Sequence, residues 1–431
     1  MNLEGESDCR KPPAGWETRS IEDVFNVVER PVKMDGDRSY RRVTVKRRHG
    51  GIELRDVQLG ADIKVKNQFL IKAGDFLISE RQIVHGACGI VPPELEGALV
   101  SNEYLVLKPC EGFDATYFNY LVQLLKYAKL FLRCSQGVDI EKFLFKPKDW
   151  LRKEIPVPPS LEQRKIAAIL SAMDDKLDVI ARQMDAVQAL KRGLMQTLFR
   201  RGVGTKDATG RWVPHTEFKV SELGEIPAAW EIRSLESVAN VERGKFSARP
   251  RNDPRYFEGG DIPFIQTGDI AGAARFIDKA SQFLNDKGLG VSKLFKPGTI
   301  FLTIAANIGD VAIAARPMAC PDSVVGINSI EGVCNNTWLY YLLNVSKDYF
   351  DSRATQNAQK NINLQVLRPF LFALPSMPEQ QRIADVLTAV DDKLNVLSSN
   401  RTHYKTLKHG LMQKLLTGEW RVKLDVVPAT G

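Results

Sequence analysis

The sequence lacks the features that would indicate a metal site, a secreted protein or a membrane protein. Its six cysteines include no C-x-x-C pair, and with only five histidines they argue against structural zinc and suit a reducing compartment. The N-terminus is acidic and polar, unlike a signal peptide. The most apolar stretch, residues 300–315, contains Asn307 and Asp310 and is too short to cross a bilayer. We expect a cytoplasmic protein without membrane contact.

Signatures of catalysis are also missing. The sequence contains no G-x-x-x-x-G-K-[ST] loop, and Gly288-Leu289-Gly290 lacks the third glycine of a dinucleotide site. Residues 307–310 lack the proline and aromatic residue of an adenine-flipping methyltransferase loop. Residues 139–142 share only a superficial likeness with a nuclease carboxylate cluster, and surface charge is the favoured interpretation. We expect a non-catalytic chain that binds no metal and no cofactor.

The sequence contains two similar copies of one long segment. Residues 158–199 and 375–416 share their openings, and Glu162-Gln163, Ile166-Ala167, Asp174–Leu177 and Gly193–Gln196 all recur 217 positions later. This offset is about half the chain, which indicates a tandem duplication of one unit.

Each copy has the pattern of a long amphipathic helix. Apolar residues recur at steps of mostly four and three, the spacing of a helix-pairing seam. Those of the first copy are Ile166, Leu170, Met173, Leu177, Ile180 and Met184, and those of the second are Ile383, Leu387, Val390, Leu394 and Leu397. A helix over residues 161–199 would be roughly 58 Å long and must bury its apolar stripe. One such stripe would suit an ordinary bundle helix, but two matched copies favour pairing with each other.

Between the helices lie two mixed segments that resemble one another weakly. Short β-like runs at residues 42–46 and 69–71 and a helix at 114–131 are predicted in the first. The predicted organisation is a first mixed domain with a short tail, a first long helix, a linker, a second mixed domain, a second long helix and a tail, at residues 1–155, 156–201, 202–217, 218–373, 374–418 and 419–431. The matching anchors include residues 13–17 with 227–231 and residues 72–79 with 296–303, and the different sequences between them predict two domains of one fold with unlike surfaces.

The charge of the chain favours a polyanionic partner. Its formal net charge is +8 and its pI is about 9.0. Basic residues gather in segments that we predict to be loops, with Tyr40, His49 and Tyr256 among them. The candidate DNA contacts are Arg38, Tyr40, Arg41, Arg42, Lys46, Arg47, Arg48, Arg81, Gln136, Lys245, Arg249, Arg251, Arg255, Asn307, Gln356, Gln359, Lys360 and Asn361. For any single one of these cations a solvated surface charge is the alternative, and the glutamines and Asn361 could equally cap turns.

The proline-led openings of the two copies resemble a known family, the specificity subunits of type I restriction–modification systems. The motif is E-Q-x-x-I-A, at residues 162–167 and 379–384, and each copy continues through Asp-Asp-Lys-Leu to Gly-Leu-Met-Gln. Residues 260–265, 307–312 and 359–362 are further family-like pieces. The resemblance covers nearly the whole chain, although the first recognition domain lacks the clear K-N-I element found at 360–362.

The resemblance implies an α+β fold: two mixed α/β target-recognition domains separated by two antiparallel helices in a coiled coil, with a pseudo-two-fold repeat. Each domain would read half of a split site in double-stranded DNA. The helices would set the spacing and dock DNA adenine methyltransferase subunits, and a motor-nuclease restriction subunit would join them. S-adenosylmethionine, ATP and Mg would then bind to these partners. The alternative is a coiled-coil scaffold that binds proteins without recognising DNA.

Overall fold

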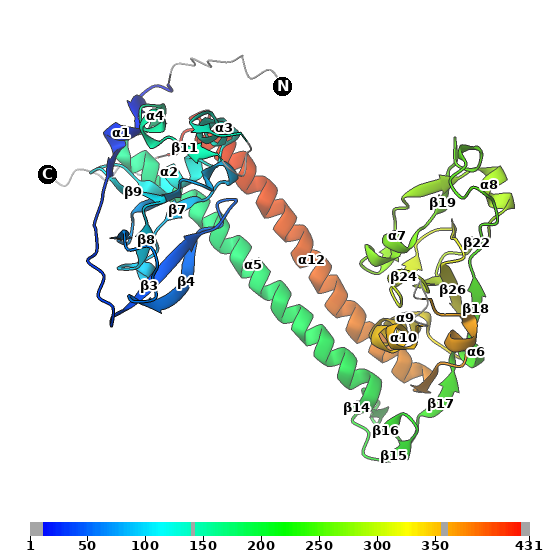
Figure 1. The fold of residues 1–431 in the computed structure, drawn as a ribbon. Helices are drawn as coiled ribbons and strands as arrows, with labels where there is room; N and C mark the ends of the chain where they lie inside the picture. The colour runs from blue at the N-terminus through cyan, green and yellow to red at the C-terminus, as the bar shows by residue number, and fades with distance from the viewer. Residues whose placement is uncertain (1–11, 139–142, 355–360, 424–431) are drawn as a thin grey trace. The chain divides into compact units, whose positions relative to one another are not determined.

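The protein divides into two compact units. The computed structural model describes residues 12–138, 143–354 and 361–423 (Figure 1). Unit 1 comprises residues 1–181 and 399–431, and unit 2 comprises residues 182–398. Each unit therefore contains one globular region and a part of each long helix. The predicted boundaries between the recognition domains and the long helices stay a prediction.

Two long helices occupy the repeated segments. Helix α5 runs over Ser160–Arg201, 42 residues, and α12 over Met377–Leu415, 39 residues, close to the predicted bounds. All members of the predicted apolar seam are withdrawn from solvent. Those that are buried are Ile166, Leu170, Ile180, Ile383, Leu387 and Leu397, and those that are half-buried are Met173, Leu177, Met184, Val390 and Leu394. The continuous 3.6-residue periodicity explains why both helices could be predicted.

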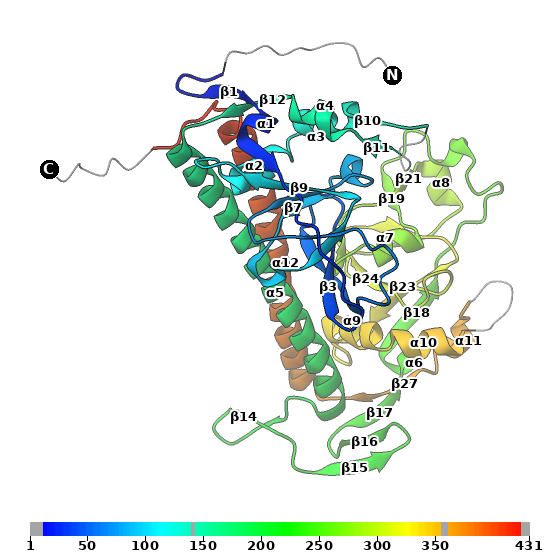
Figure 2. The ribbon, with the colours of Figure 1, turned by 60° about the vertical axis from the view of Figure 1, so that its left-hand side comes forward.

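Unit 1 is built on two four-stranded sheets. The first has the order β4 (Ile52–Leu59), β3 (Ser39–Val45), β8 (Leu99–Ser101) and β5 (Gln68–Leu70). The second has the order β2 (Phe25–Val27), β9 (Tyr104–Pro109), β6 (Phe76–Ser79) and β7 (Cys88–Ile90). Figure 2 labels β3, β7 and β9 of these sheets, and α2. The β-like runs predicted at 42–46 and 69–71 correspond to β3 and β5.

The remaining elements of unit 1 are short. Two strand pairs are β1 (Glu17–Ser20) with β12 (Glu154–Val157) and β10 (Ser135–Gln136) with β11 (Leu144–Phe145). The helical elements are α1 (Ile21–Val24), η1 (Ile83–His85), η2 (Pro93–Leu95), α2 (Ala115–Leu121), α3 (Leu125–Arg133) and α4 (Pro147–Leu151). The prediction of one helix over 114–131 is wrong, because the chain turns at Leu124, which has an extended conformation. The turn separates α2 from α3, and α3 buries Tyr127 and Phe131.

Unit 2 repeats this plan with one five-stranded and one four-stranded sheet. One has the order β18 (Ala239–Arg243), β26 (Val324–Ser329), β23 (Ile300–Thr303), β24 (Val311–Ala314) and β20 (Phe276–Ile277). Another has the order β21 (Gln282–Leu284), β19 (Ile262–Phe264), β25 (Met318–Ala319) and β22 (Leu294–Phe295). Two-stranded pairs are β17 (Glu231–Ser234) with β27 (Leu371–Leu374), β13 (Thr205–Lys206) with β14 (Trp212–Val213), and β15 (Phe218–Ser221) with β16 (Gly224–Pro227). The helical elements are α6 (Leu235–Val238), η4 (Pro254–Tyr256), α7 (Thr267–Ala271), α8 (Asp286–Gly290), α9 (Asn336–Val345), α10 (Lys347–Arg353) and α11 (Leu364–Leu367).

The two units share one sheet topology. The order β2-β9-β6-β7 of unit 1 corresponds to β18-β26-β23-β24 of unit 2, and every neighbouring pair in both is antiparallel. The β1–β12 pair corresponds in the same way to β17–β27, and both of these pairs end just before a long helix. The mixed α/β repeat predicted from the sequence anchors is therefore present in the structure.

A buried glutamate fixes the start of each long helix to its unit. In unit 1, the Trp16 indole donates to Glu162 at 3.1 Å, and the Arg421 guanidinium donates to both carboxylate oxygens at 2.7 and 2.8 Å. In unit 2, Trp230 donates to Glu379 at 2.9 Å. A carboxylate withdrawn from water requires such partners.

Glu379 has a different second set of partners. The backbone N–H groups of Val203 and Gly204 donate to it at 3.0 and 3.1 Å, and His215 Nε2 lies 2.9 Å from it. In both units, the segment that follows one helix therefore contacts the first turn of the other helix. Within each unit, the two helix segments run antiparallel.

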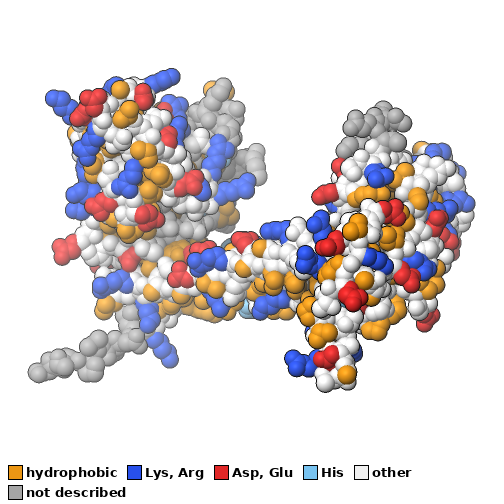
Figure 3. All heavy atoms as spheres, turned by 90° about the horizontal axis from the view of Figure 1, so that it is seen from below, with side chains coloured by type: hydrophobic (Ala, Val, Ile, Leu, Met, Phe, Trp, Pro, Cys, Tyr) orange, Lys and Arg blue, Asp and Glu red, His pale blue; other side chains and the backbone are white. Residues whose placement is uncertain are grey.

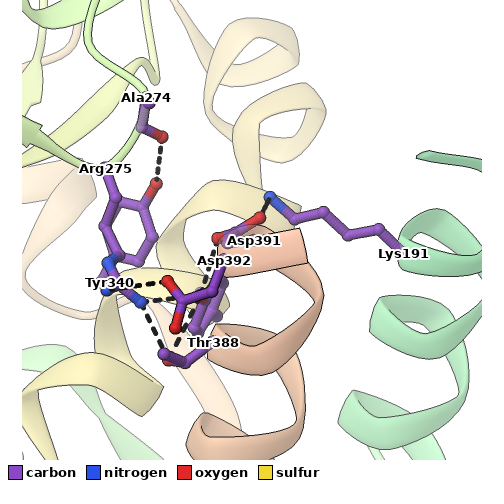
Figure 4. Close-up of polar contacts among 8 residues, drawn as sticks. Lys191, Ala274, Arg275, Tyr340, Thr388, Asp391 and Asp392 are labelled. Atoms are coloured by element: carbon purple, nitrogen blue, oxygen red, sulfur yellow. Dashed lines mark hydrogen bonds and ion pairs between the residues drawn. The ribbon is translucent and has the colours of Figure 1, made fainter. Parts of the chain in front are cut away.

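A second duplicated contact joins the helices to the globular regions. In unit 2, the Tyr341 hydroxyl donates to Asp391 at 2.7 Å, and Lys191 Nζ lies 2.6 Å from the same carboxylate (Figure 4). Unit 1 has the equivalent set, in which Tyr120 donates to Asp174 at 2.7 Å and Lys408 donates to it at 2.5 Å. Each set unites α5, α12 and one helix of the globular region, which is α2 in unit 1 and α9 in unit 2.

Unit 2 has an additional polar contact beside this set. Arg275 donates to Thr388 at 2.9 Å and lies 3.9 Å from Asp392, while Tyr340 donates to the carbonyl of Ala274 at 3.3 Å (Figure 4). Burial raises the pKa of Tyr341 to about 12, so its hydroxyl remains a donor at neutral pH. These contacts fix the position of α9 along the axis of α12.

Removal of the Asp391 carboxylate should therefore destabilise unit 2. Asp391→Ala leaves Lys191 and the Tyr341 hydroxyl without their acceptor at a site where the carboxylate is only 10% exposed. We expect the free energy of unfolding to fall by about 2–4 kcal/mol. The matched control is Glu231→Ala, which breaks a pair with Arg233 in which the glutamate is 70% exposed and should cost at most about 1 kcal/mol. Equal changes in melting temperature for the two variants would contradict this role of Asp391.

Candidate nucleic-acid interface

The first basic cluster of the sequence lies on a β-hairpin. Tyr40, Arg41 and Arg42 belong to β3, so the prediction that the whole cluster forms a loop is wrong for these three. Alternation along the strand buries Tyr40, whose hydroxyl accepts the backbone N–H of Asp35 at 3.0 Å. Tyr40 is therefore a core residue, and Arg38 packs its guanidinium over the Tyr40 ring at 5.6 Å.

Several cations of the hairpin already have protein partners. Arg42 donates to both carboxylate oxygens of Asp56 at 2.8 and 2.7 Å, and these hydrogen bonds hold the pKa of Asp56 below its usual range. Arg41 donates to the carbonyl groups of Glu94 and Glu96. These hydrogen bonds occupy the guanidinium groups of Arg41 and Arg42, so a ligand can contact only the solvent-exposed atoms of these two side chains.

Lys46 and Arg81 are exposed and paired. Lys46 lies 2.5 Å from Glu53, and Arg81 lies 2.6 Å from Glu103. Exposed ion pairs of this kind are weak and exchange partners readily. Gln136 is exposed on the short strand β10. All three can contact a polyanion without disturbing the core.

The turn that joins β3 to β4 contains the remaining predicted cations of the hairpin. Arg47 donates to Gln82 at 2.8 Å. In the described part of the chain, the Arg48 side chain has no hydrogen bond or ion pair, and it is exposed. The turn places Arg48 and His49 beside the η1 turn, which ends at His85.

The predicted cations of unit 2 all lie in the connection between β18 and β19. Arg249 donates to the carbonyl groups of Phe246 and Ala248, which curls it back onto its own loop. Arg251 lies 3.0 Å from Asp322, and Lys245 is exposed.

The later part of this connection contains η4. Arg255 is 73% exposed and lies 2.6 Å from Asp253, and it also packs over Tyr256 at 5.8 Å. Figure 3 shows Lys and Arg side chains interspersed with acidic ones over the globular parts. On the face shown there, the positive charge is distributed in small groups.

A strained turn lies between β23 and β24. Ala306 has a positive φ of 61°, and the neighbouring Asn307 is exposed, with its carbonyl group accepting the hydroxyl of Thr303. Asn361 forms an isolated bridge with Ala305, so Asn307 and Asn361 lie at one site. The predicted contacts Gln356, Gln359 and Lys360 lie outside the described residues, as do residues 139–142.

The described residues hold no cluster of ligands suited to a metal ion. Five cysteines are free thiols, and burial raises the pKa of the Cys334 thiol to about 12, which makes it unreactive at neutral pH. A search of the described helices finds none with the length and apolar character of a bilayer span.

The arrangement so far defines a duplicated protein with two similar α/β units and exposed basic hairpins and loops. Comparison with known proteins gives its family. Residues 13–189 and 227–402 each match the type I restriction modification DNA specificity domain, and the chain belongs to this family.

Its relatives match over most of their length. The chain is 27% identical over 426 residues to the putative type I restriction enzyme MjaX specificity subunit of Methanocaldococcus jannaschii. This alignment covers 95% of each of the two chains. It is also 27% identical over 327 residues to the MjaVIII specificity subunit of the same organism, covering 70% of each.

Solved structures show the same fold. The type I restriction–modification S subunit from M. genitalium aligns with a TM-score of 0.57 at 13% identity, over 99% of both chains. A chain from a study of complex assembly and conformational transition of the type I R-M system also gives 0.57, at 19% identity, over 95% of this chain and 100% of that one.

The environment of His49 predicts a pH dependence. Its ring lies 3.5 Å from the Cys88 sulfur, and burial lowers the pKa of the imidazole. Below about pH 6.5 the imidazole of the unfolded chain becomes protonated, whereas the folded ring stays neutral to a lower pH. The stability that the neutral His49 ring contributes is therefore complete above about pH 6.5 and decreases as the pH falls. His49→Asn should therefore lose less stability than the wild type between pH 7 and pH 5.

Thermal melting at the two pH values measures this difference. Asparagine tolerates the left-handed backbone conformation of position 49, so the substitution adds little strain. His403→Asn, at an exposed position of α12 in the same unit, is the matched control. If the His49 and His403 variants lost equal stability on acidification, burial of His49 would not be the cause.

Proposed function

We propose that this chain is the DNA-recognition subunit of a type I restriction–modification complex and has no catalytic activity itself. The observation that carries this proposal is the duplication: two copies of the specificity domain fill the chain, with one sheet topology but different loops. Two unlike reading surfaces on one repeated scaffold suit a bipartite, asymmetric site in double-stranded DNA.

The exposed cations and amides of both units would contact the duplex. Phosphate contacts would position it, and a few side chains would read base edges in the major groove. The proposed set consists of Arg38, Arg41, Arg42, Lys46, Arg47, Arg48, Arg81, Gln136, Lys245, Arg249, Arg251, Arg255, Asn307 and Asn361, together with Gln356, Gln359 and Lys360. We assign Tyr40 a packing role because its ring is buried.

The long helices would set the spacing between the two half-sites. The antiparallel contacts of α5 and α12 within each unit support pairing of the helices as a coiled-coil spacer. Their exposed faces would dock DNA adenine methyltransferase subunits, and a motor-nuclease subunit would join for restriction. S-adenosylmethionine, ATP and Mg would bind to those partners, and the complex would act in the cytoplasm.

A protein-binding scaffold is the competing interpretation. It would need the paired helices but not the exposed basic hairpins and loops. DNA binding through phosphate contacts weakens steeply as salt is raised, because each contact releases condensed counterions. Weak binding that is insensitive to salt in the assembled complex would favour the scaffold.

A genome-wide map of N6-methyladenine, with and without the gene, tests the proposed function. We expect a split motif with a fixed unspecified gap that disappears on deletion and returns on complementation. Such a map would identify both half-sites at once. A map that does not change in a strain that expresses the methyltransferase partner would contradict the proposal, and co-purification establishes whether that partner is present.

Shortening both helices tests the spacer. Deletion of residues 178–184 and 395–401 removes one matched heptad from each helix and retains the contacts of Asp174 with Lys408 and of Asp391 with Lys191. The helices shorten by about 10 Å. At about 3.4 Å per base pair, the gap in the methylated motif should shrink by about three base pairs.

The control is deletion of residues 178–184 alone, which puts the two helices out of register and should abolish methylation. A folded double-deletion variant that methylates the original motif with its original gap would contradict the spacer proposal.

A further inference from the structure

The turn between β3 and β4 has an unusual backbone. Arg48 and His49 have positive φ values of 58° and 54°, and Ala306 is the third non-glycine residue with this conformation in the described part of the chain. L-residues other than glycine adopt it at a cost, and native proteins retain such residues mainly at functional sites. Arg48 and His49 together form the type I′ turn of a two-residue hairpin loop, closed by the N–H of Gly50 donating to the carbonyl of Arg47 at 3.2 Å, and such turns prefer Asn, Asp and Gly to the Arg and His found here.

Contacts with the η1 turn hold this backbone in place. The N–H of Arg48 donates to the carbonyl of His85 at 2.7 Å, and the N–H of His49 donates to that of Gly86 at 2.8 Å. A Cβ atom at Gly86 would lie only 2.9 Å from His49 Nε2, so the glycine leaves room for the ring. The strained conformation is therefore fixed by its neighbours before any ligand binds.

The turn forms the wall of a cavity of about 380 Å³. Arg47, Arg48, His49 and His85 supply its polar side, and Ala128 and Phe131 of α3 supply an apolar floor. The volume is within the range of ligand sites, and the described residues that line the cavity include no carboxylate. Its chemistry is that of an anion site.

Phosphate is the anion that suits these groups. A guanidinium presents several N–H donors in a fork that matches phosphate oxygens. The hydrogen bond from Arg47 to Gln82 fixes one arginine, while the exposed Arg48 keeps its donors available. Arg41 and Arg42 of the same hairpin donate to carbonyl groups and to Asp56.

We infer that the Arg47–His49 turn and its cavity bind a phosphate group of the DNA backbone. The inference rests on the proposed function and makes it more specific. It assigns to this turn an affinity that does not depend on base sequence, so the turn positions the duplex and does not read it. The arginines fixed on β3 are secondary to it.

The test is Arg48→Gly in the full chain, co-purified with its methyltransferase partner. Glycine adopts the same backbone without strain, so the melting temperature should rise by roughly 2–4 °C. Affinity for a duplex that carries the methylated motif should fall about 3- to 10-fold, and affinity for a scrambled duplex should fall by the same factor. The slope of log K against log salt should decrease in magnitude by about 0.9, the value for one phosphate contact.

Two further variants separate charge from position. Arg55→Ala removes the same charge from an exposed site on β4 that does not line the cavity, and should change both affinities less than 2-fold. Arg48→Lys keeps the charge without the fork of donors, and should restore most of the salt slope but only part of the affinity.

Each outcome decides between the alternatives. A rise in melting temperature with unchanged affinity would overturn the inference, while strong salt-dependent binding by the wild type would preserve the proposed function. Loss of affinity for the methylated motif alone would assign Arg48 to base reading and overturn the phosphate role. Saturable binding of AMP below millimolar concentrations, lost in Arg48→Gly and not matched by inorganic phosphate, would assign the cavity to a free nucleotide and overturn the inference. Failure of the wild-type complex to bind DNA would defeat the proposed function and the inference together.

Discussion

A buried carboxylate at the start of each long helix holds its unit together. Glu162 is 1% exposed and Glu379 2% exposed, and an unpartnered carboxylate at such a site would be strongly unfavourable. Each is satisfied by a tryptophan from the strand region and by donors from the segment that follows the opposite helix, Arg421 in unit 1 and the backbone of Val203 and Gly204 in unit 2. In each unit, the need to pair one buried charge therefore brings three segments together: the one that contains the tryptophan, the start of one long helix and the stretch that follows the other helix.

The sequence was sufficient to predict the repeat and the helices, because periodicity and self-similarity are local properties. It did not reveal which charges meet. Asp174 and Asp391 were visible as part of a repeated motif, yet their partners Lys408 and Lys191 are defined only by the antiparallel course of the segments. One signal was available, since both lysines also recur 217 positions apart, as do the aspartates. A charged residue duplicated beside an apolar seam is a candidate for a contact between the helices.

The basic hairpin shows where sequence reasoning stops. A cluster of cations predicts positive potential, but it does not distinguish a side chain that pairs across a sheet from one that remains available. Arg42 has Asp56 opposite it only because β3 and β4 pair in one register, and Tyr40 is buried only because the strand alternates. The distinctive property of Arg48 is its φ angle, which follows from the hydrogen bonds of the turn with residues 85 and 86. Three-dimensional pairing therefore selects among cations that the sequence presents as equivalent.

The composition of the two units has a consequence for synthesis of the chain. Unit 2 is one continuous stretch, residues 182–398, whereas unit 1 also needs residues 399–431. Arg421, which satisfies Glu162, and Met412, Leu415 and Leu416, which complete the core around α2, lie in that last stretch. Domains usually fold in the order in which the ribosome delivers them. Here unit 1 begins before unit 2 but is completed after it, so the apolar surface that Met412, Leu415 and Leu416 cover stays exposed until these residues have been synthesised.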